Sequence, residues 1–277
     1  MKILKFGGSS ISSAERINSV CDIIKNEYQR KSVVVSAMGG VTDLLIKLAE
    51  EKNKSKYETI FNDIKKKHLQ CVKKLKLKKV EFIDNYFIEL QKVSKNYKID
   101  LKEKKDQILC FGELLSSKII STNLSENFGV KSEQLDARKV IKTNESYGNA
   151  FVYLEESSLL IKKYFSKINK VQIITGFLGS SENGNSTTLG RSGSDYTASI
   201  FGAALKVSLI EIWTDVNGIL SANPKIVKNV VNIPKLNYEE AMELAHAGAK
   251  VIFPPTMIPA LYNNIPIKIK NTFNLKN

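Results

Sequence analysis

The chain has little cysteine, histidine and tryptophan for its 277 residues: three Cys, two His and one Trp. The cysteines, Cys21, Cys71 and Cys110, have no C-x-x-C spacing and cannot all pair within one chain, which favours a reducing, cytoplasmic location. His68 and His246 stand alone, which argues against a histidine metal site. We expect no histidine-based catalysis, and the serines have no triad context that would indicate nucleophilic hydrolysis.

Long hydrophobic runs, low-complexity segments and internal repeats are also missing. The apolar run at the N-terminus is too short for a signal peptide, and no stretch approaches the ~20 apolar residues that cross a membrane. With 43% hydrophobic and 8% aromatic residues, the chain has enough apolar side chains for a sizeable core, which excludes a disordered protein. We therefore expect a folded protein with no membrane partner.

Acidic residues are few relative to basic ones, because 28 Asp and Glu stand against 42 Lys and Arg, giving a net charge of +14. Such an excess raises the hypothesis of a nucleic acid, an anionic lipid or an anionic substrate as partner. In the Lys-rich segment 52–105, however, acidic residues are interspersed with the lysines, which is typical of a solvated helical face. We expect no nucleic-acid partner, and tight, salt-dependent RNA binding would contradict this expectation.

Short apolar runs alternate with helical patterns along the chain, and Ser12 and Glu15 have the spacing of a capping box. Strands are expected at about 3–6, 33–35, 130–135, 171–175, 207–213 and 265–269, with a hairpin over 177–189. Helical patterns follow the first strand, begin near 42 and 106, and cover 52–105, 194–205 and 238–247. The alternation predicts an α/β fold, a three-layer α/β/α sandwich around a mainly parallel sheet, with ligands at the carboxyl ends of strands.

Lys5 lies within the first strand and is followed by Gly7 and Gly8 at an expected strand-to-helix turn. Backbone N–H groups of such a turn can hold a phosphate, and Lys5 adds a positive charge beside them. Many strand-to-helix turns need glycine for structural reasons alone, so this motif by itself is not specific.

Two further motifs combine polar groups with turn residues. In 190–196, Arg191 can grip a carboxylate through two parallel hydrogen bonds, and Asp195 can hold a metal or orient a lysine. The alternative is an ordinary helix N-cap with a surface arginine. In 213–218, Thr214 and Asp215 follow a strand and can face a ligand, or they simply belong to a turn.

Gly112–Glu113 and 248–250 complete the candidate motifs. Glu113 is expected near the start of an apolar helix, where the helix dipole favours a carboxylate. Lys250 can reach a phosphate, or it merely offsets the dipole of the helix before it.

Taken together and in this order, the motifs resemble those of the aspartate kinases of the amino-acid kinase family. The resemblance spans Lys2 to Phe273, and six motifs in register make it specific. The matching segments are Leu4–Ser10 (LKFGGSS), Val33–Thr42 (VVVSAMGGVT), Gly112–Glu113, Gly190–Ala198 (GRSGSDYTA), Trp213–Val216 (WTDV) and Glu239–Val251 (EEAMEL and GAKV).

The resemblance implies transfer of a phosphoryl group from ATP, with Mg²⁺, to the side-chain carboxylate of L-aspartate, giving 4-phospho-L-aspartate on the way to lysine, threonine and methionine. That carboxylate has a reference pKa of ~3.9 and is ionised at pH 7, so it needs no general base. Lys5 and Asp195 are implied to be catalytic, and no residue is assigned as a metal ligand. The implied aspartate-binding residues are Ser36, Thr42, Glu113, Arg191 and Ser194. The implied ATP-binding residues are Lys5, Gly7, Gly8, Thr214, Asp215, Lys250 and Val251.

The resemblance also implies one amino-acid kinase domain over residues 1–277. Its amino-acid-binding lobe would cover about 1–170 and its nucleotide-binding lobe about 171–277. Larger relatives carry C-terminal regulatory modules that bind lysine or threonine; we expect no such module here and a kinase insensitive to those amino acids. A cytoplasmic homodimer is also expected.

The chain departs from the family pattern after Asp215, where Asn217, Leu220, Asn223 and Lys225 replace residues that include a nucleotide-contacting aromatic and arginine. Phe253 also stands where histidine is frequent. Two alternatives stay open: a kinase for another small, glutamate-like carboxylate, and, because of Leu220, Asn223 and Lys225, a catalytically weak binding or regulatory subunit.

Overall fold

Parallel strands form the central sheet of this computed structural model, which describes residues 1–27, 32–222, 226–246 and 253–274. In these ranges the sheet has six strands in the order β11-β8-β1-β2-β5-β3, and every neighbouring pair is parallel. The strands are β1 (Lys2–Phe6), β2 (Ser32–Val35), β3 (Ser132–Leu135), β5 (Val171–Thr175), β8 (Leu209–Thr214) and β11 (Ile267–Asn271).

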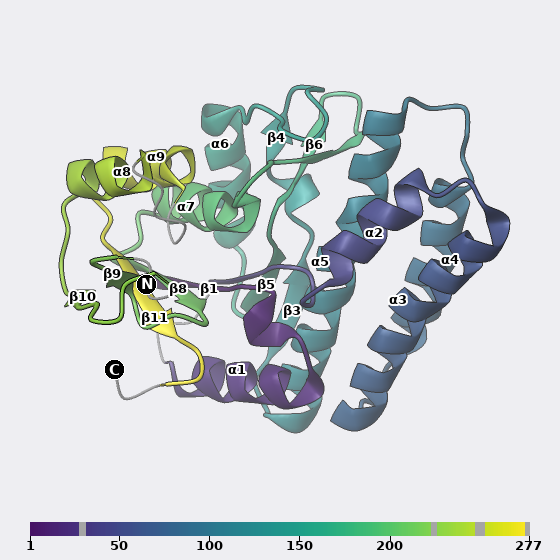
Figure 1. The fold of residues 1–277 in the computed structure, drawn as a ribbon, viewed down its shortest axis with the longest axis horizontal. Coiled ribbons are helices and arrows are strands. Elements are labelled where there is room, and N and C mark those ends of the chain that lie inside the picture. The colour runs from purple at the N-terminus through teal and green to yellow at the C-terminus, as the bar shows by residue number, and fades with distance from the viewer. Residues whose placement is uncertain (28–31, 223–225, 247–252, 275–277) are drawn as a thin grey trace.

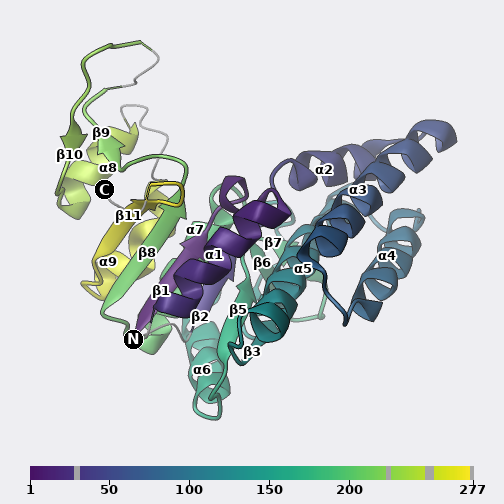
Figure 2. The same ribbon diagram turned by 90° about the horizontal axis from the view of Figure 1, so that it is seen from below.

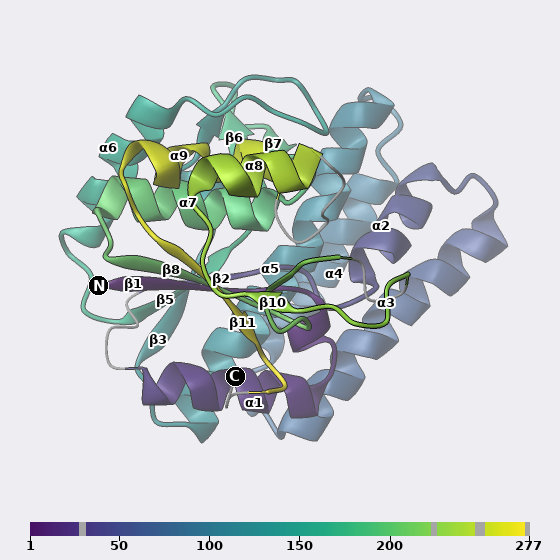
Figure 3. The ribbon, with the colours of Figure 1, turned by 60° about the vertical axis from the view of Figure 1, so that its left-hand side comes forward.

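Helices cover both faces of the sheet (Figure 1). One layer holds α6 (Leu154–Phe165), α7 (Gly193–Leu205), α8 (Tyr238–His246) and α9 (Ile258–Tyr262), and the opposite layer holds α1 (Ala14–Asn26) and α5 (Leu101–Asn127) (Figure 3). Further helices, α2 (Val41–Glu50), α3 (Lys54–Leu75) and α4 (Glu81–Ser94), extend beside α5 and away from the sheet (Figure 2). The predicted three-layer sandwich is therefore confirmed.

The remaining elements are short and lie mostly at the ends of strands. The strands β4 (Lys142–Thr143), β6 (Leu178–Ser181) and β7 (Ser186–Thr188) form a small sheet, and β9 (Ile219–Leu220) pairs with β10 (Asn232–Ile233). The 3-10 helices are η1 (Ser9–Ile11), η2 (Ala137–Lys139) and η3 (Pro254–Met257).

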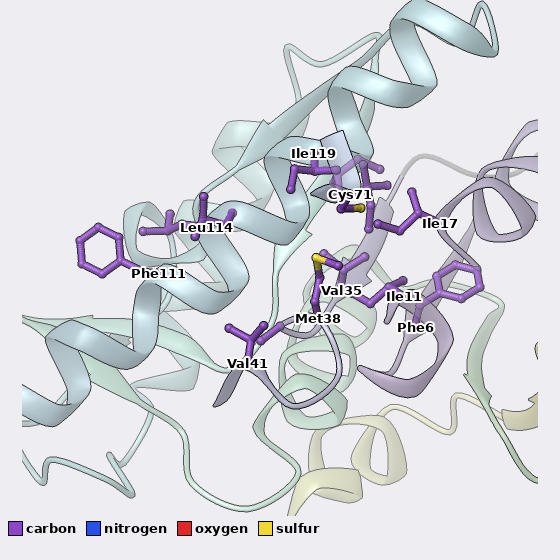
Figure 4. Packing of buried hydrophobic residues seen from close by; sticks show 14 of the residues in the cluster. Phe6, Ile11, Ile17, Val35, Met38, Val41, Cys71, Phe111, Leu114 and Ile119 are labelled. Atoms are coloured by element: carbon purple, nitrogen blue, oxygen red, sulfur yellow. The ribbon is translucent and has the colours of Figure 1, made fainter. Parts of the chain in front are cut away.

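Alternation along β1 sends its side chains to the two helical layers, because successive residues of a strand point to opposite faces. Leu4 and Phe6 pack with the α1 and α5 side, and Ile3 packs with Ala198 and Phe201 of α7. Figure 4 shows part of the first core, where Phe6, Val35 and Met38 lie among side chains from α1 and α5. Lys5, two residues after Ile3, consequently lies on the face that α7 covers.

Several local expectations differ from the structure. Ser13, not Ser12, caps α1, accepting a hydrogen bond from Arg16 N, because Ser12 instead donates to Ser9 O. No side chain caps α7, since its N-cap residue, Ser192, adopts a left-handed backbone with φ of 54°. The last strand begins at Ile267 rather than 265.

The largest difference concerns Gly112 and Glu113, which lie in the middle of α5 and not at a helix start. The segment before them, 101–111, is already helical, because Asp100 caps α5 by accepting a hydrogen bond from Lys102 N. The helix-dipole explanation for Glu113 is therefore wrong, and its role has to come from tertiary contacts.

No helix in the described part of the chain is both long and apolar enough to cross a membrane. The three cysteines are buried and unpaired, and burial raises the pKa of each thiol to about 12.

Candidate active site

Lys5 and Asp195 form an ion pair at the carboxyl end of β1. Lys5 Nζ lies 2.7 Å from Asp195 Oδ1, and the two side chains are 10% and 20% exposed. Asp195 belongs to the first turn of α7, which covers the face of β1 that carries Lys5. Lys5 is buried and Asp195 is half-buried, so the pair places an ammonium group at the carboxyl end of β1 beside a carboxylate that orients it.

Gly7 and Gly8 bring the neighbouring strand ends close to this pair. The N–H of Gly7 donates to Trp213 O at 3.2 Å, which joins the end of β1 to the end of β8. A Cβ on Gly8 would lie 2.9 Å from Ala37 O, so a side chain there would collide with the turn that follows β2. The two glycines thus allow the backbone of three segments to lie close together near Lys5: the end of β1, the end of β8 and the turn after β2.

The turn after β2 is held in place by α5 and α7. Ser36 Oγ donates to Ser194 Oγ at 3.0 Å, and Ser116 Oγ donates to Ser36 O at 2.7 Å. The N–H of Ala37 donates to Glu113 Oε1 at 3.0 Å. Three of the predicted aspartate-binding residues, Ser36, Glu113 and Ser194, therefore lie around one turn.

Glu113 is a buried acid without an ion-pair partner in the described residues. Burial raises the pKa of Glu113 to about 8, although the hydrogen bonds from backbone N–H groups oppose the shift. At neutral pH this carboxyl is therefore mostly protonated when no cation faces it. A cation placed beside it would restore the charged form.

Arg191 lies on an exposed turn between β7 and α7. Gly190 has φ of 72° and Ser192 has φ of 54°, so the residues on both sides of Arg191 have left-handed backbone conformations. The guanidinium Cζ lies 5.3 Å from the centre of the Phe253 ring. The guanidinium of Arg191 is thus exposed and lies over an aromatic ring.

Thr214 is the last residue of β8 and Asp215 follows it, at the same carboxyl end of the sheet as Lys5. Thr214 Oγ1 donates to Asp215 Oδ1 at 3.1 Å, and Asp215 is exposed. Thr42 is half-buried in the first turn of α2. Lys250 and Val251, like Asn223 and Lys225, lie outside the described residues.

Lys67 is a site neighbour that the sequence did not indicate. It extends from α3, and its Nζ donates to Gly39 O, in the same turn that Glu113 and Ser116 support. Among the many lysines of the segment 52–105 no local pattern marks it, because the contact depends on how α3 packs beside α2.

Gly112 lets α5 approach that turn, because a Cβ at this position would lie 2.7 Å from Ala37 Cβ. We expect Gly112→Ala to lower the free energy of unfolding by ~1 kcal/mol, since overpacking outweighs the better helix propensity of alanine. The displaced turn should raise the KM for the amino-acid substrate by about tenfold. Thermal unfolding and initial rates measure the two effects.

The double variant Gly112→Ala with Ala37→Gly serves as the control, because it removes the methyl group that the new side chain meets. It should recover most of the lost affinity. An unchanged KM in Gly112→Ala alone would show that this close approach does not shape the site.

A separate hollow of about 590 Å³ lies along the free edge of β11. Residues 217–219, 232–238 and 266–269 line much of it. None of the predicted site residues that the structure describes belongs to its lining. Lys5 with Asp195, Ser36 with Ser194, and Glu113 lie instead at the carboxyl ends of β1 and β2.

Comparisons with known proteins identify the family of this chain. Residues 1–271 match the model of the amino acid kinase family. Aspartokinase 1, chloroplastic, of Arabidopsis thaliana is 37% identical over 99% of this chain and 50% of that protein. Lysine-sensitive aspartokinase 3 of Escherichia coli is 33% identical over 96% of this chain and 60% of that protein.

Solved structures give the same result. The crystal structure of E. coli aspartokinase III in complex with aspartate and ADP (R-state) is 30% identical, with a TM-score of 0.94. That match covers 100% of this chain and 63% of that one. The chain thus spans between half and two thirds of the length of these relatives, and its resemblance to aspartate kinases is confirmed. With the family match over nearly its whole length, the chain belongs to the amino acid kinase family.

Proposed function

We propose that this chain transfers the γ-phosphoryl group of ATP to the side-chain carboxylate of L-aspartate. The observation that carries the proposal is the Lys5–Asp195 pair, at 2.7 Å, beside the turn that Glu113 holds. The E. coli structure that contains aspartate and ADP supports the same substrates, because its fold matches this chain from end to end.

The acceptor carboxylate is ionised at neutral pH, so the reaction needs positioning and charge stabilisation rather than a general base. We propose that Lys5 stabilises the charge on the transferring phosphoryl group and that Asp195 orients Lys5. The backbone N–H groups at Gly7 and Gly8 would contact the phosphoryl oxygens.

Aspartate carries one ammonium and two carboxylates, and the site offers a group for each sign of charge. We propose that Glu113 pairs with the ammonium and that Arg191 grips a carboxylate through its planar fork. Ser36, Thr42 and Ser194 would supply hydroxyl groups to the same molecule. The buried Glu113 also argues against a substrate whose amino group is acetylated, since such a group brings no positive charge.

We propose that Thr214, Asp215, Lys250 and Val251 hold the nucleotide. Mg²⁺ carried by the phosphates fits the described residues, because Asp195 and Asp215 offer one or two carboxylates, which are the protein ligands that Mg²⁺ takes beside substrate phosphates. When bound, Mg²⁺ would neutralise charge on the phosphates. The division into lobes at about residue 170, the homodimer and the cytoplasmic location stay predictions.

The direct test is an ATP-dependent hydroxamate assay, in which hydroxylamine traps the acyl phosphate. We expect product with L-aspartate and much less with L-glutamate. Product with glutamate alone would favour the glutamate-like alternative. No product with either, from a protein that still binds aspartate, would favour a binding subunit.

The pKa of about 8 for Glu113 predicts proton release on substrate binding. The substrate ammonium should stabilise the charged carboxylate, so at pH 7 binding of aspartate should release about one proton. Because that proton has to leave, the affinity should weaken by about tenfold for each pH unit below 8. Calorimetry in buffers of different ionisation enthalpy measures the release.

Glu113→Gln is the matched variant, since glutamine keeps the shape and an acceptor for Ala37 N–H. It should bind aspartate more weakly, release no proton and show little pH dependence between pH 5.5 and 7.5. Equal proton release by the Gln variant and the parent would rule out Glu113 as the source.

A further inference from the structure

Asp106 lies on the same helix as Glu113 and is almost fully buried, with 1% of its surface exposed. The two acids are seven residues apart, which is two helical turns, so they share a face of α5 about 10 Å apart along its axis. No ion pair involves Asp106 within the described residues. What this second buried acid does is not explained by the proposed chemistry.

Three hydrogen bonds end on the Asp106 carboxylate. Oδ2 accepts from Gly148 N at 3.0 Å and from Thr188 N at 2.8 Å, and Oδ1 accepts from Thr188 Oγ1 at 2.9 Å. Burying a carboxylate without a cation is unfavourable, and an apolar side chain would fill the same space at lower cost. The presence of a buried acid at this position is therefore best explained by the three hydrogen-bond donors that it holds together.

These donors belong to two segments that flank the turn carrying Arg191. The N–H of Ala150 donates to Thr188 O at 2.9 Å, which joins the segment after Gly148 to the end of β7. Gly190 packs directly against the side chain of Asn149, so close that a Cβ at Gly190 would overlap it. Asp106 thus holds together the segment 148–150 and the end of β7, the two segments that lie next to the turn carrying Gly190 and Arg191.

We propose that Asp106 is a positioning residue that sets Arg191 relative to Glu113 and thereby the affinity for the amino-acid substrate. One helix, α5, would then position both ends of that substrate. Glu113 would act directly by binding the ammonium, and Asp106 would act indirectly by holding the turn that carries Arg191. The inference rests on the proposed function, because it assumes that Arg191 and Glu113 contact the same molecule.

Two variants of Asp106 separate its hydrogen bonds from its volume. Asp106→Leu keeps a similar size and removes all three acceptor contacts, and we expect it to raise the KM for aspartate by about 10- to 100-fold. The KM for ATP should change by less than about threefold. Asp106→Asn can still accept from both N–H groups and donate to Thr188 Oγ1, so its KM for aspartate should stay within about threefold of the parent.

A double-mutant cycle with Arg191→Ala tests whether Asp106 acts through the arginine. In the Arg191→Ala background, Asp106→Leu should change kcat/KM for aspartate by less than about twofold, because the residue that it positions is already gone. If the two effects simply multiply, or if Asp106→Leu alone leaves the KM for aspartate unchanged, the inference is wrong.

Circular dichroism first establishes that each variant is folded. If Asp106→Leu is not, Thr188→Val removes only the Oδ1 contact; the KM for aspartate should rise by about threefold, and no rise would overturn the inference. Parallel increases in both KM values would also overturn it, since they indicate general loosening. A parent protein that makes no aspartyl hydroxamate would reject the proposed function itself, whereas an active parent with an unaffected Leu variant would reject only the role of Asp106.

Discussion

Lys5→Ala is expected to lower kcat by about 10³-fold, because it removes the positive group proposed to stabilise charge on the transferring phosphoryl. The KM for aspartate should change far less, since Lys5 is proposed to contact the phosphoryl group and not the ammonium or the distal carboxylate of the substrate. Asp195 would also lose its partner at 2.7 Å, so part of the loss would come from a carboxylate left unpaired beside the phosphates. Initial rates at saturating aspartate and ATP measure the effect.

Lys2→Ala provides a control in the same strand. Lys2 pairs with Glu27 at 2.9 Å and with Glu211 at 3.5 Å, at the amino end of β1, on the far side from the site. The Lys2→Ala variant should keep kcat within about threefold of the parental value. If Lys5→Ala retains a tenth or more of the parental kcat, Lys5 does not stabilise the transferring phosphoryl group.

Arg191→Ala is expected to raise the KM for aspartate by about 100-fold, which corresponds to ~2.7 kcal/mol, the scale of a lost bidentate carboxylate contact. The Arg191 side chain is exposed, so its removal should hardly change thermal stability. Separate titrations of aspartate and ATP distinguish this effect from a general loss of activity.

Arg191→Lys keeps the charge and loses the planar fork, so it should recover only part of the affinity. Full recovery by lysine would mean that charge alone, without bidentate geometry, holds the carboxylate. An unchanged KM in Arg191→Ala would place the substrate carboxylate elsewhere.

The positions of strands and helices were predictable because they follow from local patterns. The apolar runs at 33–35 and 171–175 are buried strands, and alternation within β1 places Lys5 on the face opposite Phe6. The glycines after Phe6 likewise follow from local need, since the chain there leaves a strand and approaches other backbone closely. Patterns of this kind act over one or two turns of helix or a few residues of strand.

The setting of Glu113 was not predictable in the same way. Glycine is disfavoured inside a helix, so the glycine directly before Glu113 favours a helix that starts at that point. The structure keeps both residues in the middle of α5, because Gly112 allows the close approach of Ala37, and Glu113 then accepts the Ala37 N–H. Tertiary packing outweighs propensity here, and it also creates the burial that raises the pKa of Glu113.

The sequence by itself determined the layered α/β class, the ends of the strands at which polar residues collect, and the family that these motifs resemble. Only the tertiary structure decided which of those residues meet: Lys5 with Asp195, Glu113 with Ala37, and Asp106 with the base of the Arg191 turn. The physical reason is that side-chain direction and turn conformation are local properties of the chain. A contact between distant segments depends on how parallel strands order themselves and how α5 and α7 pack against the sheet.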